Sequence, residues 1–192
     1  MLPYAPLHHL LFKYMKADFI VMTSANMPGE PMFIDEGIMD GVKLDGYLVH
    51  NLKIASRCDD SVVKILNNKQ VFIRRSRGYV PKEISINTKK DVIAVGAELY
   101  NSICVVKNGR AIVSQYVGDT SRFTTYRDFF KDVIAFFTRF LKPKIEAIIC
   151  DAHPLYNTSN FARELSVRES IALYPLQHHF AHAMSVMAER NM

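Results

Sequence analysis

The strongest constraint on the fold is a series of short apolar strands in the second half of the chain. Asn108 and Gly109 stand between two of these strands, 102–106 and 111–117, and both residue types tolerate the positive φ angles of a two-residue β-hairpin turn. Another apolar stretch, 92–96, precedes them. The sequence therefore predicts an antiparallel meander of three strands.

A long amphipathic pattern follows the meander. From 125 to 141 the large apolar residues fall on one stripe at helical spacing, Thr125 and Asp128 stand at capping positions, and Pro143 ends the pattern. An apolar strand over 145–150, a helix over 160–167, a strand over 172–176 and a helix from His178 are predicted next. The resulting order, β-β-β-α-β-α-β followed by a helix, predicts an α/β domain.

The first third of the chain mixes helix and strand signals. Pro6 begins a helix expected over 7–15, and a buried strand expected over 19–22 leads into a polar loop over 23–31. Further strands are predicted over 47–50, 61–66 and 71–74, with a turn at 67–69 joining the last two. Residues 83–91 are polar and without clear periodicity, so we expect a linker there between domains at 1–82 and 92–192.

The composition excludes several classes of protein. A hydrophobic content of 49% suits a globular core and argues against disorder. The apolar runs are far shorter than the roughly 20 residues that span a bilayer, and no secretory signal pattern follows Met1, so we expect no membrane segment and a cytoplasmic protein. Cys58, Cys104 and Cys150 lie far apart, which argues against a disulfide framework and against a cysteine-based zinc site.

Polar segments in the first third are candidates for an anion site. The loop over 23–31 follows a predicted strand, which is where α/β proteins commonly bind ligands. The stretch 57–64 adds acids, a hydroxyl and cations, and the cluster of Arg74, Arg75 and Arg77 offers guanidinium groups that bind phosphate oxygens in pairs. Ordinary turn residues, a salt-bridged start of a strand and a solvated basic face are the alternative interpretations of these segments.

Two histidines near the end of the chain are candidates for metal ligands. His178 and His182 are four residues apart, so on a helix they share one face and can bind one ion through neutral imidazole. His179 points about 100° away from them. Two ligands do not complete a site, so others must come from further residues or from a bound nucleotide. The alternative is a polar start of a helix.

Several of these segments, taken together and in order, resemble one family, the HypF carbamoyltransferases of nickel-iron hydrogenase maturation. Residues 2–11, 22–31, 57–63 and 74–81 are similar to the latter part of its YrdC-like domain. The second half is similar to the actin-like (ASKHA) domain that follows it, at residues 95–99, 119, 151–154 and 177–182. The implied fold is therefore α/β: the C-terminal part of a YrdC-like domain, then the N-terminal part of an actin-like domain.

The resemblance implies a chemistry and a set of site residues. The family forms carbamoyl-adenylate from ATP and a carbamate derived from carbamoyl phosphate, and passes the carbamoyl group to the C-terminal cysteine of HypE. Ser24, Asn26, Ser61 and Arg75 would bind the ATP phosphates. His178 and His182 would hold a divalent metal ion, either zinc, iron or magnesium, while no catalytic residue is assigned. Because the family has further domains, we expect this chain to be an internal piece that is inactive alone.

The chain departs from the family pattern in three segments. Phe180 stands where the family often has a third consecutive histidine, and Ala25 where many relatives carry glycine. Residues 96–100 read Gly-Ala-Glu-Leu-Tyr where the family commonly reads Gly-Gly-Glu-x-Lys, which puts a phosphate or substrate contact there in doubt.

Other functions remain open at this point. Arg74, Arg75 and Arg77 could contact RNA phosphates nonspecifically in a nucleic-acid-binding module, or the chain could be an inactive remnant. A metallopeptidase ranks last, because no glutamate follows His178 as it does in H-E-x-x-H.

Overall fold

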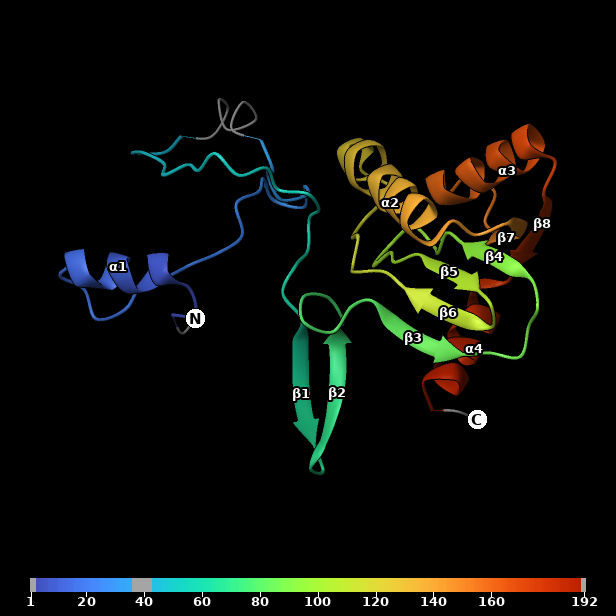
Figure 1. Cartoon of the computed structure of the whole chain (residues 1–192), viewed down its shortest axis with the longest axis horizontal. Helices are drawn as coiled ribbons and strands as arrows, with labels where there is room; N and C mark the ends of the chain where they lie inside the picture. Colours follow the sequence, from blue (N-terminus) through green and yellow to red (C-terminus); the bar gives the residue numbers. More distant parts are fainter. Residues whose placement is uncertain (1–2, 36–42, 191–192) are drawn as a thin grey trace.

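The computed structural model describes residues 3–35 and 43–190. The first part contains α1 (Pro6–Tyr14), β1 (Val62–Leu66) and β2 (Lys69–Arg74). The second part contains β3 (Lys82–Ser85), β4 (Asp91–Ala94), β5 (Cys104–Lys107), β6 (Arg110–Val113), the π-helical segment η2 (Thr125–Phe130), α2 (Lys131–Leu141), β7 (Ile145–Asp151), α3 (Asn157–Glu169), β8 (Ala172–Leu176) and α4 (His178–Arg190). Figure 1 shows a largely extended first part beside a layered second part.

The second part is built on a six-stranded sheet of order β3-β6-β5-β4-β7-β8. β4, β5 and β6 form the predicted antiparallel meander, and β7 and β8 continue the sheet as parallel strands. Asn108 and Gly109 form the predicted turn, with φ angles of 50° and 74°. The prediction of this α/β arrangement is confirmed.

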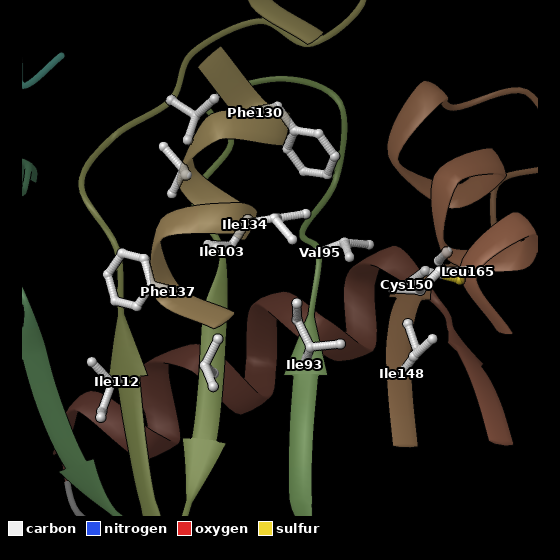
Figure 2. Close-up of a cluster of buried hydrophobic side chains, with 14 of the residues drawn as sticks. Ile93, Val95, Ile103, Ile112, Phe130, Ile134, Phe137, Ile148, Cys150 and Leu165 are labelled. Atoms are coloured by element: carbon white, nitrogen blue, oxygen red, sulfur yellow. The ribbon is translucent and has the colours of Figure 1, made fainter. Parts of the chain in front are cut away.

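The core of the second part lies between the sheet and two helices. α2 and α3 cover one face, and α4 crosses the other (Figure 1). Phe130, Ile134 and Phe137 pack on sheet residues such as Ile93, while Leu165 of α3 packs near the β7 residues Ile148 and Cys150 (Figure 2). A smaller cluster of Val92, Val106, Ala111 and Ala147 lies apart from this core. Strand residues point alternately to opposite faces, which is why neighbours such as Val92 and Ile93 join different clusters.

Two strands predicted in the first part are wrong. Neither 19–22 nor 47–50 forms a strand, and most of their apolar side chains are exposed, such as Phe19 at 81% and Val21 at 92%. An apolar run records a preference for extended backbone, but a strand forms only where a neighbouring strand completes its hydrogen bonds. The hairpin of β1 and β2 is as predicted, with Asn67 and Asn68 at positive φ in its turn.

The segment expected to be a linker contributes a strand to the sheet. β3 pairs antiparallel with β6, from Lys82 opposite Val113 to Ser85 opposite Arg110. It is an edge strand, so its largely exposed, polar sequence carries little of the periodicity expected for a buried strand. The domain limits at 1–82 and 92–192 stay a prediction.

The predicted helix over 125–141 is divided into two parts. η2 is π-helical and leads into the α-helix α2. The expected capping is wrong: Thr124 before η2 has helical backbone angles without a side-chain cap, and the Asp128 carboxylate binds the neighbouring Arg127 side chain instead. Lys142, in the left-handed conformation, ends α2 just before Pro143. Within 3–35 and 43–190, no helix combines the length and apolarity needed to cross a bilayer.

The three cysteines are free thiols, as expected from their spacing. Cys150 is buried, whereas Cys58 and Cys104 are partly buried. Burial raises the pKa of the Cys104 thiol to about 11, so this thiol is protonated at neutral pH and is a poor nucleophile.

We expect Gly96→Ala to lower the free energy of unfolding by about 2–3 kcal/mol. Gly96 has a φ of 72°, and a Cβ there would lie 2.6 Å from both the Asn101 side-chain nitrogen and the Ser102 carbonyl oxygen. Gly118→Ala is the matched control, because its φ of 106° is also unfavourable but its nearest neighbour is 3.7 Å away. Urea unfolding of both variants tests this; equal destabilisation would mean that the close contact has no effect.

Candidate functional site

A pocket of about 330 Å³ lies where the first and second parts of the chain meet. We call it the junction pocket. Its polar and charged lining residues come from both parts: Ser24, Asn26, Glu30, Asp59 and Arg74 from the first, and Tyr116, Asp119, Arg122 and Thr125 from the second. The π-helical segment η2 supplies Thr125 and Phe129 to its wall. Insertions of this kind in helices are frequent at functional sites.

Two predicted nucleotide-binding residues, Ser24 and Asn26, line this pocket. The Ser24 hydroxyl donates to the Asn26 side-chain oxygen at 2.6 Å. The Asn26 amide nitrogen donates to the carbonyl oxygens of Met27 and Glu30, at 2.9 and 3.1 Å. Asn26 therefore holds the loop in shape, while the Ser24 hydroxyl can turn toward a ligand by exchanging a single hydrogen bond.

The loop of Ser24 and Asn26 is anchored to the second part by Arg122. The Arg122 guanidinium lies 3.6 Å from the Glu30 carboxylate and 4.0 Å from the Asp119 carboxylate. It packs so closely on Gly29 that a Cβ there would lie 2.5 Å from the guanidinium carbon. The second carboxylate oxygen of Glu30 is buried without a hydrogen-bond partner. The ion pairs of Arg122 and its close packing on Gly29 hold the two parts together at this pocket.

Arg57 is a second connection between the parts, and the sequence did not reveal its role. Its side chain is buried and donates to the carbonyl oxygens of Met32 at 2.6 Å and Asp128 at 2.8 Å. The Gln115 side chain in turn donates to the Arg57 carbonyl oxygen at 3.1 Å. Burial lowers the pKa of the Arg57 guanidinium, and the nearby carboxylates of Asp132 and Asp128 oppose that shift. The role of Arg57 depends on contacts with residues far away in the sequence, which a local sequence pattern does not reveal.

The other two predicted nucleotide-binding residues lie elsewhere. The Ser61 hydroxyl accepts from the Ser76 backbone N–H at 2.8 Å and donates to the Arg77 carbonyl oxygen at 3.0 Å, so it ties β1 to the arginine-rich segment. Arg75 lines a different pocket. Its guanidinium carbon lies 3.7 Å from the centre of the Phe72 ring, and a guanidinium nitrogen lies 3.3 Å from a carboxylate oxygen of Glu189 in α4. The structure thus brings Ser24 and Asn26 together, but not all four residues.

The three clustered arginines do not form one open basic face. The Arg74 guanidinium carbon lies 4.8 Å from the centre of the Tyr116 ring. Arg75 forms an ion pair with Glu189, and the Arg77 guanidinium lies 3.7 Å from the Asp60 carboxylate. Each guanidinium therefore has its own neighbour, and the arrangement does not favour the nonspecific RNA contact considered from the sequence.

The histidine pair begins α4 and is supported by an aspartate. Nδ1 of His178 lies 2.7 Å from a carboxylate oxygen of Asp151, the last residue of β7. Nε2 of His178 lies 3.0 Å from Nε2 of His182. Asp151 is 9% exposed, and its other oxygen accepts from the His153 backbone N–H at 2.8 Å. A carboxylate acceptor keeps the proton on Nδ1 and leaves Nε2 free to coordinate.

The two Nε2 atoms suit a shared metal ion. Two metal–nitrogen bonds of about 2.1 Å put their nitrogens roughly 3.0–3.4 Å apart, depending on the angle between them. Among residues 3–35 and 43–190, no group of three or more His, Cys, Asp or Glu side chains could hold an ion. The described residues therefore fit two ligands of a site together with its supporting acid. Asp151 follows the apolar run 145–150 in the sequence, but its contact with His178, 27 residues later, is visible only in the structure.

Two family models define the class of this protein, a YrdC-type part followed by a Kae1-type part. Residues 1–76 match the family described as "Telomere recombination", which includes Sua5, YciO and YrdC. Residues 87–189 match the family described as "HypF Kae1-like domain". The chain belongs to the HypF carbamoyltransferase family.

Known relatives agree with this assignment. "Probable carbamoyltransferase HypF" of Methanocaldococcus jannaschii is 42% identical, and "Carbamoyltransferase HypF" of Synechocystis sp. is 37% identical; each match covers 100% of this chain and 25% of the relative. The crystal structure of T. kodakarensis HypF has a TM-score of 0.90 at 44% identity, covering 100% of this chain and 26% of that one. Full-length HypF in a phosphate- and nucleotide-bound form has a TM-score of 0.88 at 34% identity, covering 100% and 30%. The chain thus spans about a quarter of the length of these curated relatives.

Proposed function

We propose that this chain is part of a carbamoyltransferase that forms carbamoyl-adenylate from ATP and carbamoyl phosphate and transfers the carbamoyl group to the C-terminal cysteine of a HypE-type acceptor. Membership of the HypF carbamoyltransferase family supports the reaction class. The observation that carries the transfer role is the placement of the Nε2 atoms of His178 and His182 3.0 Å apart, with Asp151 bound to Nδ1 of His178.

The proposed reaction has two stages. Water hydrolyses carbamoyl phosphate to carbamate and phosphate by cleaving the bond between phosphorus and the carbamoyl oxygen. A carbamate oxygen then attacks the α-phosphorus of ATP, so that pyrophosphate leaves and carbamoyl-adenylate forms. The acceptor thiolate then attacks the carbamoyl carbonyl carbon. The bond from that carbon to the AMP oxygen breaks, AMP leaves with the bonding electrons, and the acceptor keeps a thiocarbamate.

In the first stage, the predicted ATP ligands are Ser24, Asn26, Ser61 and Arg75. The Ser24 hydroxyl and the Arg75 guanidinium would donate to phosphate oxygens, since each is held by a contact that a phosphate can replace. Asn26 and Ser61 would act mainly by shaping their loops, because their polar atoms already bind the backbone. Donors that are already oriented stabilise charge on a transferring group without further rearrangement.

In the second stage, His178 and His182 would hold a divalent metal ion, with zinc, iron and magnesium as the candidates. Such an ion supplies positive charge that polarises the carbamoyl carbonyl or orients a nucleotide. Asp151 would keep the proton of His178 on Nδ1 and raise the electron density at Nε2. HypE-type proteins are the acceptors that this proposal requires.

A segment exchange tests the proposed function. We expect the M. jannaschii relative to keep ATP-dependent carbamoylation of an acceptor C-terminal peptide when this chain replaces its matching segment. In that chimera, His182→Ala should reduce the rate by at least about 100-fold, because one of two nitrogen ligands is lost. His179→Ala is the matched control on the same helix. A folded chimera without activity, or full activity after His182→Ala, would contradict the proposal.

A further inference from the structure

An ion pair between Arg75 and Glu189 connects the β-hairpin of the first part to the last helix of the second. Arg75 directly follows β2, and its guanidinium packs on the Phe72 ring of that strand. Glu189 lies in the last turn of α4. The pair therefore places an acid of the second part on a cation that the proposed function assigns to the ATP phosphates.

The two members of this pair are held unequally. The Arg75 side chain is 23% exposed and rests on an aromatic ring, whereas the Glu189 side chain is 60% exposed. Within residues 3–35 and 43–190, Arg75 is the one cation that pairs with the Glu189 carboxylate. Exposed ion pairs contribute little stability, so a multiply charged phosphate can displace the glutamate while the guanidinium stays in place.

The helix α4 has little packing that would oppose such an exchange. None of its residues is buried, and Phe180, Met184 and Val186 are each at least 45% exposed. An element with few buried apolar contacts opens locally at a small cost in free energy. The end of α4 can therefore move away from Arg75 without disrupting the sheet.

The face of α4 that carries Glu189 also carries the histidine pair. At about 100° per residue, Glu189 lies within roughly 20° of both His178 and His182 around the helix axis. It lies about 10–17 Å from them along that axis, at roughly 1.5 Å per residue. His178 is in turn anchored to β7 through Asp151. One helix thus joins the histidine pair at its start to Arg75 at its end.

We propose that Glu189 is an autoinhibitory acid that competes with nucleotide phosphates for Arg75. While Glu189 occupies the guanidinium, the apparent phosphate affinity is reduced to the fraction of molecules in which Arg75 is free. When phosphates occupy it, the end of α4 is released, so the helix that begins with His178 and His182 responds to the state of the first site. The inference rests on the proposed function for the role of Arg75 as a phosphate ligand.

Calorimetric titration of the 192-residue chain with inorganic pyrophosphate tests this competition. Glu189→Gln should strengthen pyrophosphate binding about 2–5-fold, because Arg75 no longer has to be freed from a carboxylate. Arg75→Gln should weaken binding about 10-fold, and adding Glu189→Gln to it should then have no effect, since the contested cation is gone. Glu164→Gln, at an exposed acid of α3, removes the same charge elsewhere and is the matched control.

Hydrogen exchange measured by mass spectrometry reports on the helix itself. Saturating pyrophosphate should speed amide exchange over residues 184–190 at least about 2-fold in the parent chain, because the end of α4 loses its contact with the first part. In Glu189→Gln the exchange of this segment should be fast with or without pyrophosphate. Exchange in the parent chain that does not change with bound pyrophosphate would contradict the release of α4.

Other outcomes separate this inference from the proposed function. Unchanged affinity in Glu189→Gln, together with a loss in Arg75→Gln, would overturn the inference and leave the proposed function intact. Equal gains in Glu189→Gln and Glu164→Gln would also overturn it, because they would reflect net charge alone. Unchanged affinity in Arg75→Gln would remove Arg75 from the phosphate site, so the inference would fail together with that part of the proposed function. If neither the folded parent chain nor Glu189→Gln binds pyrophosphate, the inference fails, and carbamoylation by the chimera decides the proposed function separately.

Discussion

Replacing Phe130 with alanine is expected to lower the free energy of unfolding by about 3–5 kcal/mol. Phe130 ends η2 and is 0% exposed. Its ring is stacked on that of Tyr126, with ring centres 5.6 Å apart, and meets the ring of Phe161 in α3 edge-on, with ring centres 5.4 Å apart. Truncation would leave a cavity where η2, α3 and the sheet meet. Such a loss is a large fraction of the roughly 5–15 kcal/mol that stabilises a typical domain, so the second part would be much closer to unfolding.

Urea unfolding followed by circular dichroism measures this change through the transition midpoint. Phe140→Ala is the matched control, because Phe140 lies on the neighbouring helix α2 but is 73% exposed. Its effect should be within about 0.5 kcal/mol. Equal, small shifts for the two variants would show that the packing in Figure 2 does not stabilise the chain.

Removing one histidine of the pair should have the largest effect on metal binding. We expect His182→Ala to weaken Zn²⁺ binding by at least about 100-fold, because a single remaining nitrogen cannot chelate the ion. Asp151→Asn should weaken it about 10–100-fold, as is typical when the acid behind a metal-binding histidine is changed. The neutral amide can still accept the proton of His178 Nδ1, but it no longer supplies the negative charge that strengthens Nε2 as a ligand.

Competition with a chromophoric zinc chelator measures both variants. His179→Ala serves as the control, since this exposed histidine lies on the same helix outside the contact of His178 with His182. Unchanged Zn²⁺ affinity in His182→Ala would exclude the shared site. Unchanged affinity in Asp151→Asn alone would limit the role of this acid to packing.

The sheet of the second part was predictable because its signals are local. The turn at Asn108 and Gly109, the apolar run of β7 and the stripe on α2 each depend on residues close in sequence. The strands predicted over 19–22 and 47–50 failed because pairing depends on a partner strand, which a short apolar run does not identify. The π-helical start of the long helix was missed, since apolar spacing alone does not separate it from an α-helix.

By itself, the sequence determined the family, the α/β order of the second part, the loop of Ser24 and Asn26, and the face shared by His178 and His182. Residue types and short spacings carry this information. The tertiary structure alone decided that Arg75 and Ser24 line different pockets, that Arg57 and Arg122 join the two parts, and that Asp151 supports His178. These outcomes depend on contacts between residues far apart in the chain, whose distances arise only when the sheet, the helices and the first part pack together.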